Sequence, residues 1–461
     1  MLYKSYFFLL SVFFLSGCVF TPSYERPATV ADDDIILKAG GNNIQNSLTD
    51  LFINEPYLLE MLEHAIRHNY DLKQASLRVD SVRAQKTGAI LDFIPSANLT
   101  MTKNINMTQS LSLFTGETRK ERVDVYQSSL GIDSYEVDIW GRKLNEVKAL
   151  SHSEKHYLNA LTALHLTLMA DLASTWYETK SMIKLWHIYS ETLTTFENIN
   201  SKINVLLKAN RLEPLIHSKF IQGKANIIYS AATLEKEIHK KINRMEYLSG
   251  FSSSYINHHK WKMITGDYTI PEIKQEIKTD VIFKRPDVIS VEEKIKSVNG
   301  SIGAARAAFL PVVNIYANIY NTSNNFDNIL SGLNDNWSLS PSVIIPVFNW
   351  PKHYNNLNYV MNQQKQAVVE YKNIVAQAML DIKDATKSLV VYRDMLTTAG
   401  KEVTLHENNF SAMQKRYEAG YMDLYSYYEL VNLTCIAKAE FESYRQKTMD
   451  SVIILLKSIG G

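Results

Sequence analysis

The sequence predicts a mainly α-helical protein that also carries β-hairpins of the kind found in membrane barrels. Three observations indicate this fold class: the chain is internally duplicated, each half holds one very long helical pattern, and each half holds a pair of strand-like segments. The 461 residues are 46% hydrophobic and 21% charged, and 49 Lys and Arg nearly balance 48 Asp and Glu. This is the composition of a folded chain with a mixed surface, so no nucleic-acid partner is expected.

The N-terminus has the features of an export signal. A lysine at position 4 precedes the apolar run FFLLSVFFL, which is shorter than the ~18–20 residues needed to cross a bilayer as a helix. Residues 1–17 are therefore expected to be a cleaved signal peptide. No run of 18 or more apolar residues follows, so any membrane crossing is expected to use strands.

The segment LSGC, which ends the signal, resembles the bacterial lipoprotein signal. By this resemblance Cys18 becomes the first mature residue and is acylated, and two or more acyl chains would attach the protein stably to a membrane. The next residue is Val19 rather than an acid, which favours the outer membrane. Apart from this covalent lipid no cofactor is expected. The second cysteine, Cys435, falls in a helical pattern and is interpreted as a small core residue.

The internal duplication organises the rest of the chain. NYDL at 69–72 matches RPDV at 285–288, and KANRL at 208–212 matches EAGYM at 418–422. The offset between the copies is smaller after the strand-like segments than before them, which indicates that the first hairpin is the longer one. Each copy reads as helix, β-hairpin, very long helix, turn and medium helix.

The expected elements follow from two periodicities. In the first copy the strands fall at about 95–140, the long helix at 142–209 and the medium helix at 211–250; in the second they fall at 311–348, 351–419 and 421–460. At 1.5 Å per residue each long helix would measure roughly 100 Å, so it needs a partner along its length. Heptad spacing from Val375 to Tyr417 and from Leu158 to Leu207 predicts coiled-coil packing.

The second hairpin shows strand periodicity with one apolar and one polar face. Val313, Ile315 and Ile319 alternate with asparagines and Tyr316, as in a strand with lipid on one side and a lumen on the other. Pro341 within the last strand predicts a bulge or a local break. In the first hairpin the alternation is partial, and the assignment of its faces stays open.

Four strands cannot close a barrel by themselves. In lipid every sheet edge must be paired, because no water is present to satisfy the free backbone groups. The chain is therefore expected to oligomerise, with eight strands from two copies or twelve from three. Strand number alone leaves the choice between these open.

Several motifs in this order resemble the TolC-like outer-membrane efflux proteins, in the lipoprotein branch that serves RND-type tripartite pumps. They are the lipoprotein signal, DIWGR at 138–142, RPDV with AARAAFLP at 285–311, RYEAG at 416–420 and KSIGG at 457–461. The resemblance implies a homotrimer in which each chain gives four strands to a twelve-stranded barrel, continued by an α-helical coiled-coil tunnel. It implies passive conduction of drugs or other small molecules to the exterior, and no enzyme activity.

The resemblance also implies partners and a domain division. The expected partners are a periplasmic adaptor (membrane fusion) protein, an inner-membrane RND-type transporter and outer-membrane lipid. The expected division is a signal peptide at 1–17, a lipid-anchored linker and equatorial segment at 18–54, a first repeat at 55–250, an equatorial connector at 251–280 and a second repeat at 281–461.

Two groups of functional residues follow from the same resemblance. The turns at 208–211 and 418–421 would contact the adaptor, through Ala209, Asn210, Arg211, Ala419, Gly420 and Tyr421. A periplasmic gate would use Glu429 for an acidic ring and Tyr425 for a bulky ring, with Tyr417 and Met422 beside them. The plainer interpretations are that Gly420 and Asn210 only end helices, and that Glu429 faces solvent.

Other functions have weaker support. The pairs His64 with His68 and His152 with His156 have metal-binding spacing, but no third ligand accompanies them, which favours surface histidines. No P-loop, GxSxG or CxxC motif occurs, so the protein is not expected to be an enzyme. Two alternatives remain: an exit duct for type I protein secretion, and a lipid-anchored periplasmic scaffold without a pore.

Overall fold

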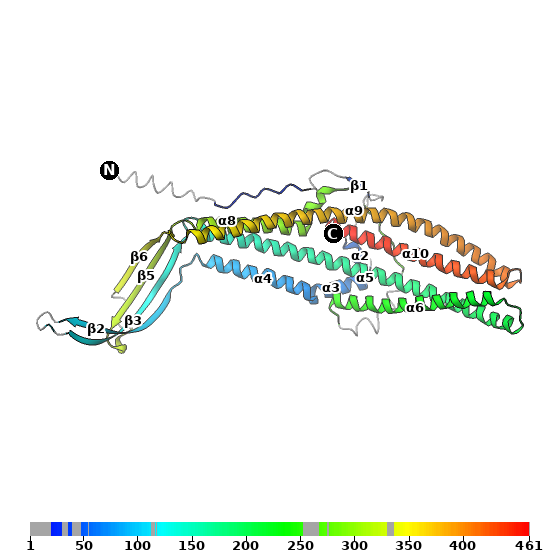
Figure 1. Cartoon of the computed structure of the whole chain (residues 1–461), viewed down its shortest axis with the longest axis horizontal. Helices are drawn as coiled ribbons and strands as arrows, with labels where there is room; N and C mark the ends of the chain where they lie inside the picture. The colour runs from blue at the N-terminus through cyan, green and yellow to red at the C-terminus, as the bar shows by residue number, and fades with distance from the viewer. Residues whose placement is uncertain are drawn as a thin grey trace. The chain divides into compact units, whose positions relative to one another are not determined.

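The protein is described by a computed structural model that covers residues 20–29, 36–38, 48–53, 55–111, 116, 118–251, 267–273, 276–329 and 336–460. Over these residues the chain is mainly helical and contains one four-stranded antiparallel sheet, which confirms the predicted fold class (Figure 1). Residues 1–17 and Cys18, with the predicted signal and acylation site, lie outside the described residues. Among the described helices, none is both long and apolar enough to cross a membrane.

The two copies of the repeat fold into matching sets of elements. The first contains α3 (Pro56–His68), α4 (Tyr70–Leu91), β2 (Asn98–Leu111), β3 (Thr118–Val137), α5 (Arg142–Lys208) and α6 (Pro214–Ser249). The second contains α8 (Pro286–Ala307), β5 (Val312–Ser323), β6 (Asn336–Ile344), α9 (Trp350–Glu418) and α10 (Leu424–Ser458). Shorter elements are β1 (Ile36–Lys38), α2 (Asp50–Ile53), β4 (Glu276–Lys278), η2 (Thr279–Lys284) and η3 (Phe326–Asn328).

The helix before the hairpin in each copy, α4 or α8, is tied to the end of the medium helix in the same way. Asn69 caps α4, because its side-chain oxygen accepts from the backbone N–H of Asp71 and Leu72, while its amide donates to the Leu248 carbonyl at 2.9 Å. At the corresponding place of the second copy, the Arg285 guanidinium donates to the Ser458 carbonyl at 3.1 Å. Different side chains therefore make the same connection in the two halves.

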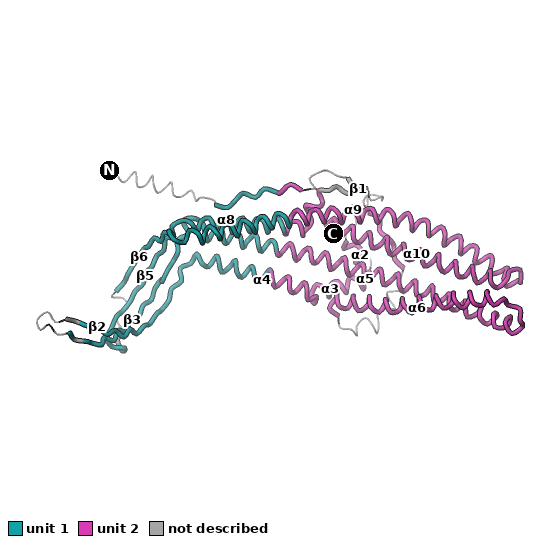
Figure 2. Tube along the Cα trace, in the orientation of Figure 1, with its two compact units in different colours: residues 1–26, 79–156, 291–370 teal, residues 27–78, 157–290, 371–461 magenta. Residues whose placement is uncertain are grey.

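The chain forms two compact units, and each takes parts of both repeats. The first, residues 1–26, 79–156 and 291–370, holds the four-stranded sheet with α8 and the adjoining parts of α4, α5 and α9 (Figure 2). In this unit α8 lies very close to α5 at Gly300, where a Cβ would stand 2.9 Å from the backbone of Ala149. The small residues of GSIGAA at 300–305 thus allow two helices to pack closely.

The second unit, residues 27–78, 157–290 and 371–461, is helical apart from the two-stranded pairing of β1 with β4. Its core contains the seam predicted on α9: Val375, Ala378, Ile382, Ala385 and Leu389 are all buried. On α5 the predicted seam is buried at Leu168, Leu172 and Phe196. Its first member, Leu158, belongs to this unit and is 49% exposed in the single chain.

The sheet has the strand order β2-β3-β5-β6, and all neighbours are antiparallel. The irregularity predicted at Pro341 is wrong: β6 pairs with β5 in unbroken register, with Pro341 opposite Ile315. β6 is an edge strand of this described sheet, where a residue without an N–H can be accommodated. The bulge lies in β3 instead, where the register with β5 shifts between Ile132 and Tyr135.

Candidate functional site

The two turns that end the long helices have the same backbone geometry. At the end of α5 the N–H of Arg211 donates to the Leu206 carbonyl at 2.9 Å, and the N–H of Asn210 donates to the Leu207 carbonyl at 3.0 Å. At the end of α9 the N–H of Tyr421 donates to Arg416 at 2.8 Å. The N–H of Gly420 donates to Tyr417 at 3.0 Å. Both are Schellman motifs, which satisfy carbonyls that the ending helix leaves without partners.

Each Schellman motif needs one residue in the left-handed region. Gly420 has φ +81° and Asn210 has φ +52°, and Asn210 is the one non-glycine residue with positive φ among those described. Glycine adopts this conformation without a Cβ penalty, and asparagine is the usual substitute. The helix-ending role expected for both residues is therefore confirmed.

The helices that leave the two turns begin differently. α10 has Asp423 as its N-cap, and the carboxylate accepts from the backbone N–H of Ser426 at 2.9 Å and from its hydroxyl at 2.6 Å. The Ser426 hydroxyl, together with the backbone N–H, holds the pKa of Asp423 below its ordinary value. α6 begins instead with Pro214 after Glu213, whose side chain makes no capping hydrogen bond.

The turn residues predicted to meet an adaptor are all on the surface. Ala209, Asn210 and Arg211 are exposed in the first turn, as are Ala419, Gly420 and Tyr421 in the second. Directly after each exposed group one apolar side chain turns inward: Leu212 in the first and Met422 in the second. Each turn thus presents a short exposed surface, and the apolar side chain that follows it packs against the helices.

Leu212 and Met422 pack against an aromatic cluster that we call the tip core. It is built from α5, α6 and α10, and its buried members are Phe196, Ile199, Ile203, Phe220, Ile227, Tyr427, Tyr428, Val431 and Cys435. At its centre the rings of Phe196, Phe220 and Tyr428 lie with centroids 5.3–5.7 Å apart. Rings at this spacing contribute more than their buried area alone. Cys435 is a buried core residue, as predicted.

Three of the four predicted gate residues contact the tip core. Met422 and Tyr425 pack against it, and Tyr417 on α9 stacks on Tyr427 with centroids 4.3 Å apart. Tyr425 also accepts a hydrogen bond from Lys219 of α6 at 3.3 Å. The fourth residue, Glu429, is half-buried one turn beyond Tyr425. Within the part of the chain described here, its carboxylate has no hydrogen bond or ion pair.

The structure adds residues that the sequence analysis did not single out. Lys202 of α5 lies over the Tyr417 ring at 4.5 Å, a cation–π contact between the two halves of the chain. Gly223 of α6 supports Tyr428: a Cβ at this glycine would lie 2.0 Å from the tyrosine hydroxyl. Burial raises the pKa of Tyr428, and the nearby Glu429 charge adds to the effect. The aromatic run LYSYYEL was the one available signal, but it does not say which tyrosine is buried.

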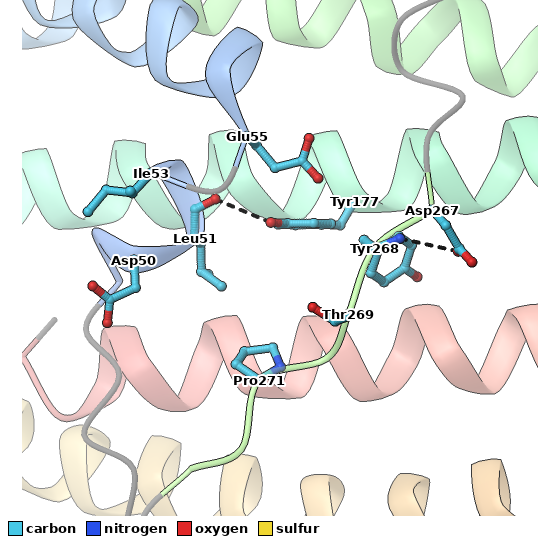
Figure 3. Close-up of a pocket in the computed structure, with 9 residues that line it drawn as sticks. All are labelled: Asp50, Leu51, Ile53, Glu55, Tyr177, Asp267, Tyr268, Thr269 and Pro271. Carbon is cyan, nitrogen blue, oxygen red and sulfur yellow. Dashed lines mark hydrogen bonds between the residues drawn. The ribbon is translucent and has the colours of Figure 1, made fainter.

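A cavity of about 550 Å³ lies beside α2 and α5, in the same unit as the turns (Figure 3). It is lined by Asp50, Leu51, Ile53, Glu55, Tyr177, Asp267, Tyr268, Thr269 and Pro271. Two of its three acids have cationic partners, since Glu55 pairs with Lys180 at 2.6 Å and Asp267 pairs with Arg445. Tyr177 is roughly 50 Å from Asn210 along α5, so this cavity is separate from the turns.

The histidine pairs of the sequence are engaged in ordinary contacts. His64 stacks on His68 and on Phe251, and its Nδ1 lies 2.7 Å from the Ser249 carbonyl oxygen. His152 pairs with Glu293 at 2.7 Å. Over the described residues, no group of three or more His, Cys, Asp or Glu side chains is arranged to hold a metal ion.

Comparison with known proteins agrees with this architecture. The family model described as "Outer membrane efflux protein" matches residues 61–199 and 280–461, which is most of the chain. The chain belongs to the outer membrane efflux protein family. It is therefore an outer-membrane protein of a class of transport channels, and the family resemblance seen in the sequence is confirmed.

Individual relatives match this family member over nearly its whole length. It is 25% identical to the solvent efflux pump outer membrane protein SrpC of Pseudomonas putida, over 98% of this chain and 97% of that protein. It is 23% identical to the probable outer membrane lipoprotein SilC of Salmonella typhimurium, over 81% and 80%. The solved structure of the Campylobacter jejuni outer membrane channel CmeC shares its fold, with a TM-score of 0.82 at 18% identity over 96% and 95%.

Proposed function

We propose that this family member is the outer-membrane exit channel of a tripartite efflux pump. In this role it conducts small molecules passively from an inner-membrane transporter and a periplasmic adaptor to the exterior. The observation that carries the proposal is the combination, in one chain of this family, of a sheet with an apolar face and two helical hairpins that end in matched exposed turns. The family membership disfavours a scaffold without a pore.

The proposed assembly is a homotrimer with a twelve-stranded barrel. The described sheet has two edges, β2 and β6, whose outer backbone groups have no strand partner in it. In lipid such edges must be paired, and pairing β2 of one copy with β6 of the next closes a ring. Three copies give a barrel wide enough for a lumen, whereas the interior of an eight-stranded barrel fills with side chains.

The two turns are proposed to dock on the adaptor. The gate residues beside the tip core are proposed to close the tunnel at rest. Three copies of Glu429 near one axis would repel each other unless they are hydrated, protonated or bound to cations. The carboxylate is half-buried and has no partner within the described chain, which leaves it available for such a ring. Tyr425, one turn earlier on α10, would supply the bulky ring.

The lipid anchor on Cys18 is supported by the residues that follow it. Arg306, near the end of α8, donates to the Phe20 carbonyl at 3.0 Å, and the Thr21 hydroxyl donates to Asn145 at 2.5 Å. These contacts hold residues 20 and 21 at the end of α8 that leads into β5. An acylated Cys18 would then lie close to the membrane strands.

Cargo selection is proposed to belong to the pump rather than to this channel. Relatives of similar identity are named for different cargoes, solvents in the case of SrpC and cations in the case of CusC of Escherichia coli. One channel architecture therefore serves pumps with different substrates. A type I secretion partner remains the second candidate, and the identity of the adaptor distinguishes the two.

The test of channel function is conductance of the purified protein in planar lipid bilayers. Wild-type protein is expected to open rarely, because its gate is closed at rest. Tyr425→Ala combined with Glu429→Ala is expected to raise conductance severalfold, since both rings lose their side chains. Glu440→Ala, an exposed acid on the same helix, is the matched control and should behave as wild type.

The outcomes separate the pore from the gate. Absence of any conductance in both proteins contradicts the channel. Conductance that is frequent in the wild type, and unchanged in the double variant, keeps the channel and contradicts the gate.

The partner is tested by crosslinking. Ala419→Cys and Arg211→Cys should crosslink to an efflux adaptor, whereas Lys236→Cys on α6 should not. Crosslinks only to a secretion adaptor would favour the second candidate.

A further inference from the structure

The register of the sheet settles which face of the first hairpin matches the apolar face of the second. Ile319 lies opposite Trp337 on one side and Leu130 on the other, and Leu130 lies opposite Leu99. Side chains on one face recur every second residue, so on β2 this face continues through four further positions. They are Met101, Lys103, Ile105 and Met107.

Lys103 is thus a cation between the apolar side chains of Met101 and Ile105 on β2, and its position along the sheet shows how far it lies from the helices. It lies opposite Tyr126, the first residue of β3 that pairs with β5. On this face of β5 the side chains are apolar from Val313 to Ile319 and polar at Asn321 and Ser323. Lys103 and Tyr126, which are level with Ser323, therefore lie just beyond the edge of the apolar band, on the side away from the helices.

At this edge two cations share one carboxylate. Arg122 donates to Asp124 through Nε at 2.8 Å and Nη2 at 3.1 Å, and the Lys103 ammonium lies 3.1 Å from the same carboxylate. The Arg122 and Lys103 side chains are 59% and 42% exposed, against 27% for Asp124. The group of three side chains carries one net positive charge, and its two cations are more exposed than its carboxylate. Lys120, two residues from Arg122, adds another on the same face.

Aromatic side chains accompany the cations. The Lys103 ammonium lies 4.9 Å from the Tyr126 ring centroid, and the Phe326 ring meets Tyr126 edge-on at 5.8 Å. Phe326 is 63% exposed, although it is a large apolar side chain. Aromatic rings at the ends of an apolar band are typical of the level where lipid headgroups begin.

We propose that Lys103 and Arg122 form a binding site for the phosphate groups of a phosphorylated glycolipid in the outer leaflet. Arginine and lysine are the side chains that bind phosphate oxygens, and the excess charge complements an anionic headgroup. Met101, Leu99 and Leu130 lie on the same face further into the band, where the acyl chains would pass. The site would be a lipid contact of the channel, and it rests on the barrel proposed above.

The test is lipid retention by the purified, detergent-solubilised oligomer, counted by native mass spectrometry. Three probes are used: lipid A with both phosphates, lipid A stripped of them, and inorganic phosphate as a competitor. Wild-type protein should retain the phosphorylated lipid preferentially. Lys103→Gln with Arg122→Gln should lower its retention on the order of tenfold to thirtyfold, because two cations at a membrane surface are lost.

A second variant is expected to move in the opposite direction. Asp124→Asn removes the carboxylate that both cations share, so it should raise retention of phosphorylated lipid A severalfold. Lys365→Gln, an exposed cation on α9, should change nothing. If the double glutamine variant fails to assemble, Lys103→Arg with Arg122→Lys keeps both charges and should retain the lipid as wild type does.

Three results would overturn the proposal: equal retention of the two forms of lipid A, unchanged retention in all assembled variants, or complete displacement by inorganic phosphate at equal phosphate concentration. The last would show a phosphate-ion site rather than a lipid site. Failure here is distinct from failure of the proposed function, because conductance in planar bilayers of uncharged lipid tests the pore without this glycolipid.

Discussion

Asp423 and Glu213 occupy corresponding positions in the two turns, yet only Asp423 caps its helix. The shorter aspartate side chain accepts from both the backbone and the hydroxyl of Ser426, whereas Glu213 makes no capping bond and its helix begins with Pro214. The two helices that leave the turns, α6 and α10, therefore start with different electrostatics.

This difference predicts a pH dependence confined to one turn. Hydrogen bonds lower the folded-state pKa of Asp423, so its stabilisation of the first turn of α10 is complete above about pH 5. It is lost as the pH falls from about 4 through the lower folded-state pKa. Hydrogen exchange at Ser426, corrected for intrinsic rates, should rise in this window. Asp423→Asn keeps the cap but should abolish the dependence, and the start of α6 should show none; an equal response in α6 would contradict the assignment.

Gly223 packs directly against Tyr428 of the tip core, with no room for a side chain between them. Gly223→Ala would put a methyl group 2.0 Å from the tyrosine hydroxyl oxygen, so the ring must move and the local packing of Phe196 and Phe220 is lost. We expect a local destabilisation of about 1–3 kcal/mol. It should be seen as faster hydrogen exchange in α6 and α10.

Removal of the hydroxyl should relieve this strain. The next Tyr428 atom would be 3.1 Å from the new methyl, so Tyr428→Phe in the Gly223→Ala background should restore most of the protection. Gly88→Ala, at a helical glycine with nothing within 4 Å, is the control and should be neutral or slightly stabilising. Identical losses in the single and double variants would show that the glycine acts in another way.

At the scale of elements, the segment 267–273 is held against the helices by Arg445, with further contacts from Arg393 to the Pro271 carbonyl and from Lys184 to Asp267. Arg445 of α10 donates to the Asp267 carboxylate and to the Tyr268 carbonyl, and its guanidinium lies 4.1 Å from the Tyr268 ring centroid. It also pairs with the buried Glu442 at 3.2 Å. This planar cation thus connects a non-helical segment to a long helix.

Arg445→Lys should therefore be a damaging change despite its conserved charge. An ammonium cannot reproduce the flat stack on Tyr268 or the several directed bonds. We expect limited proteolysis near 267–273 to speed up severalfold. Lys438→Arg, at the surface pair with Glu407, serves as the control and should leave cleavage unchanged. Equal cleavage rates in wild type and Arg445→Lys would contradict the role of the arginine.

The elements themselves were largely predictable from periodicity. Strand spacing of two and helix spacing near 3.5 are local properties, so both hairpins and both long helices follow from the sequence. The irregularity predicted at Pro341 was wrong because the sequence does not show which residues β6 faces: Pro341 lies opposite Ile315 in an unbroken register with β5. The bulge between Ile132 and Tyr135 and the contact of Gly223 with Tyr428 depend on pairing between distant segments, which local patterns do not encode.

For the whole molecule, the proposed trimer depends on strand pairing between copies. β2 and β6 are the edges of the described sheet, and Thr100, Thr102, Asn104 and Ser338 share its polar face. Closure of a ring brings these edges together between chains and nowhere within a chain.

Cysteine crosslinking between these edges should therefore give crosslinked dimers and trimers, and no larger species. Three double variants combine Ser338→Cys with Thr100→Cys, Thr102→Cys or Asn104→Cys. At least one of them should form disulfides between chains on mild oxidation. The control, Ser129→Cys with Tyr320→Cys, joins register partners of β3 and β5 and should crosslink within one chain. A ladder that stops at the dimer, or no link between chains in any combination, would contradict the closed trimer.

The matched turns have a further consequence for survival of the protein outside the cytoplasm. Each long helix reverses direction within a few residues, at 209–213 and 419–423, and most of the carbonyls at the helix ends are already hydrogen-bonded. A protease must draw an extended segment of several residues into its cleft, and these turns offer almost none without unwinding a helix. Because each reversal is tight, the exposed ends of the long helices should resist cleavage.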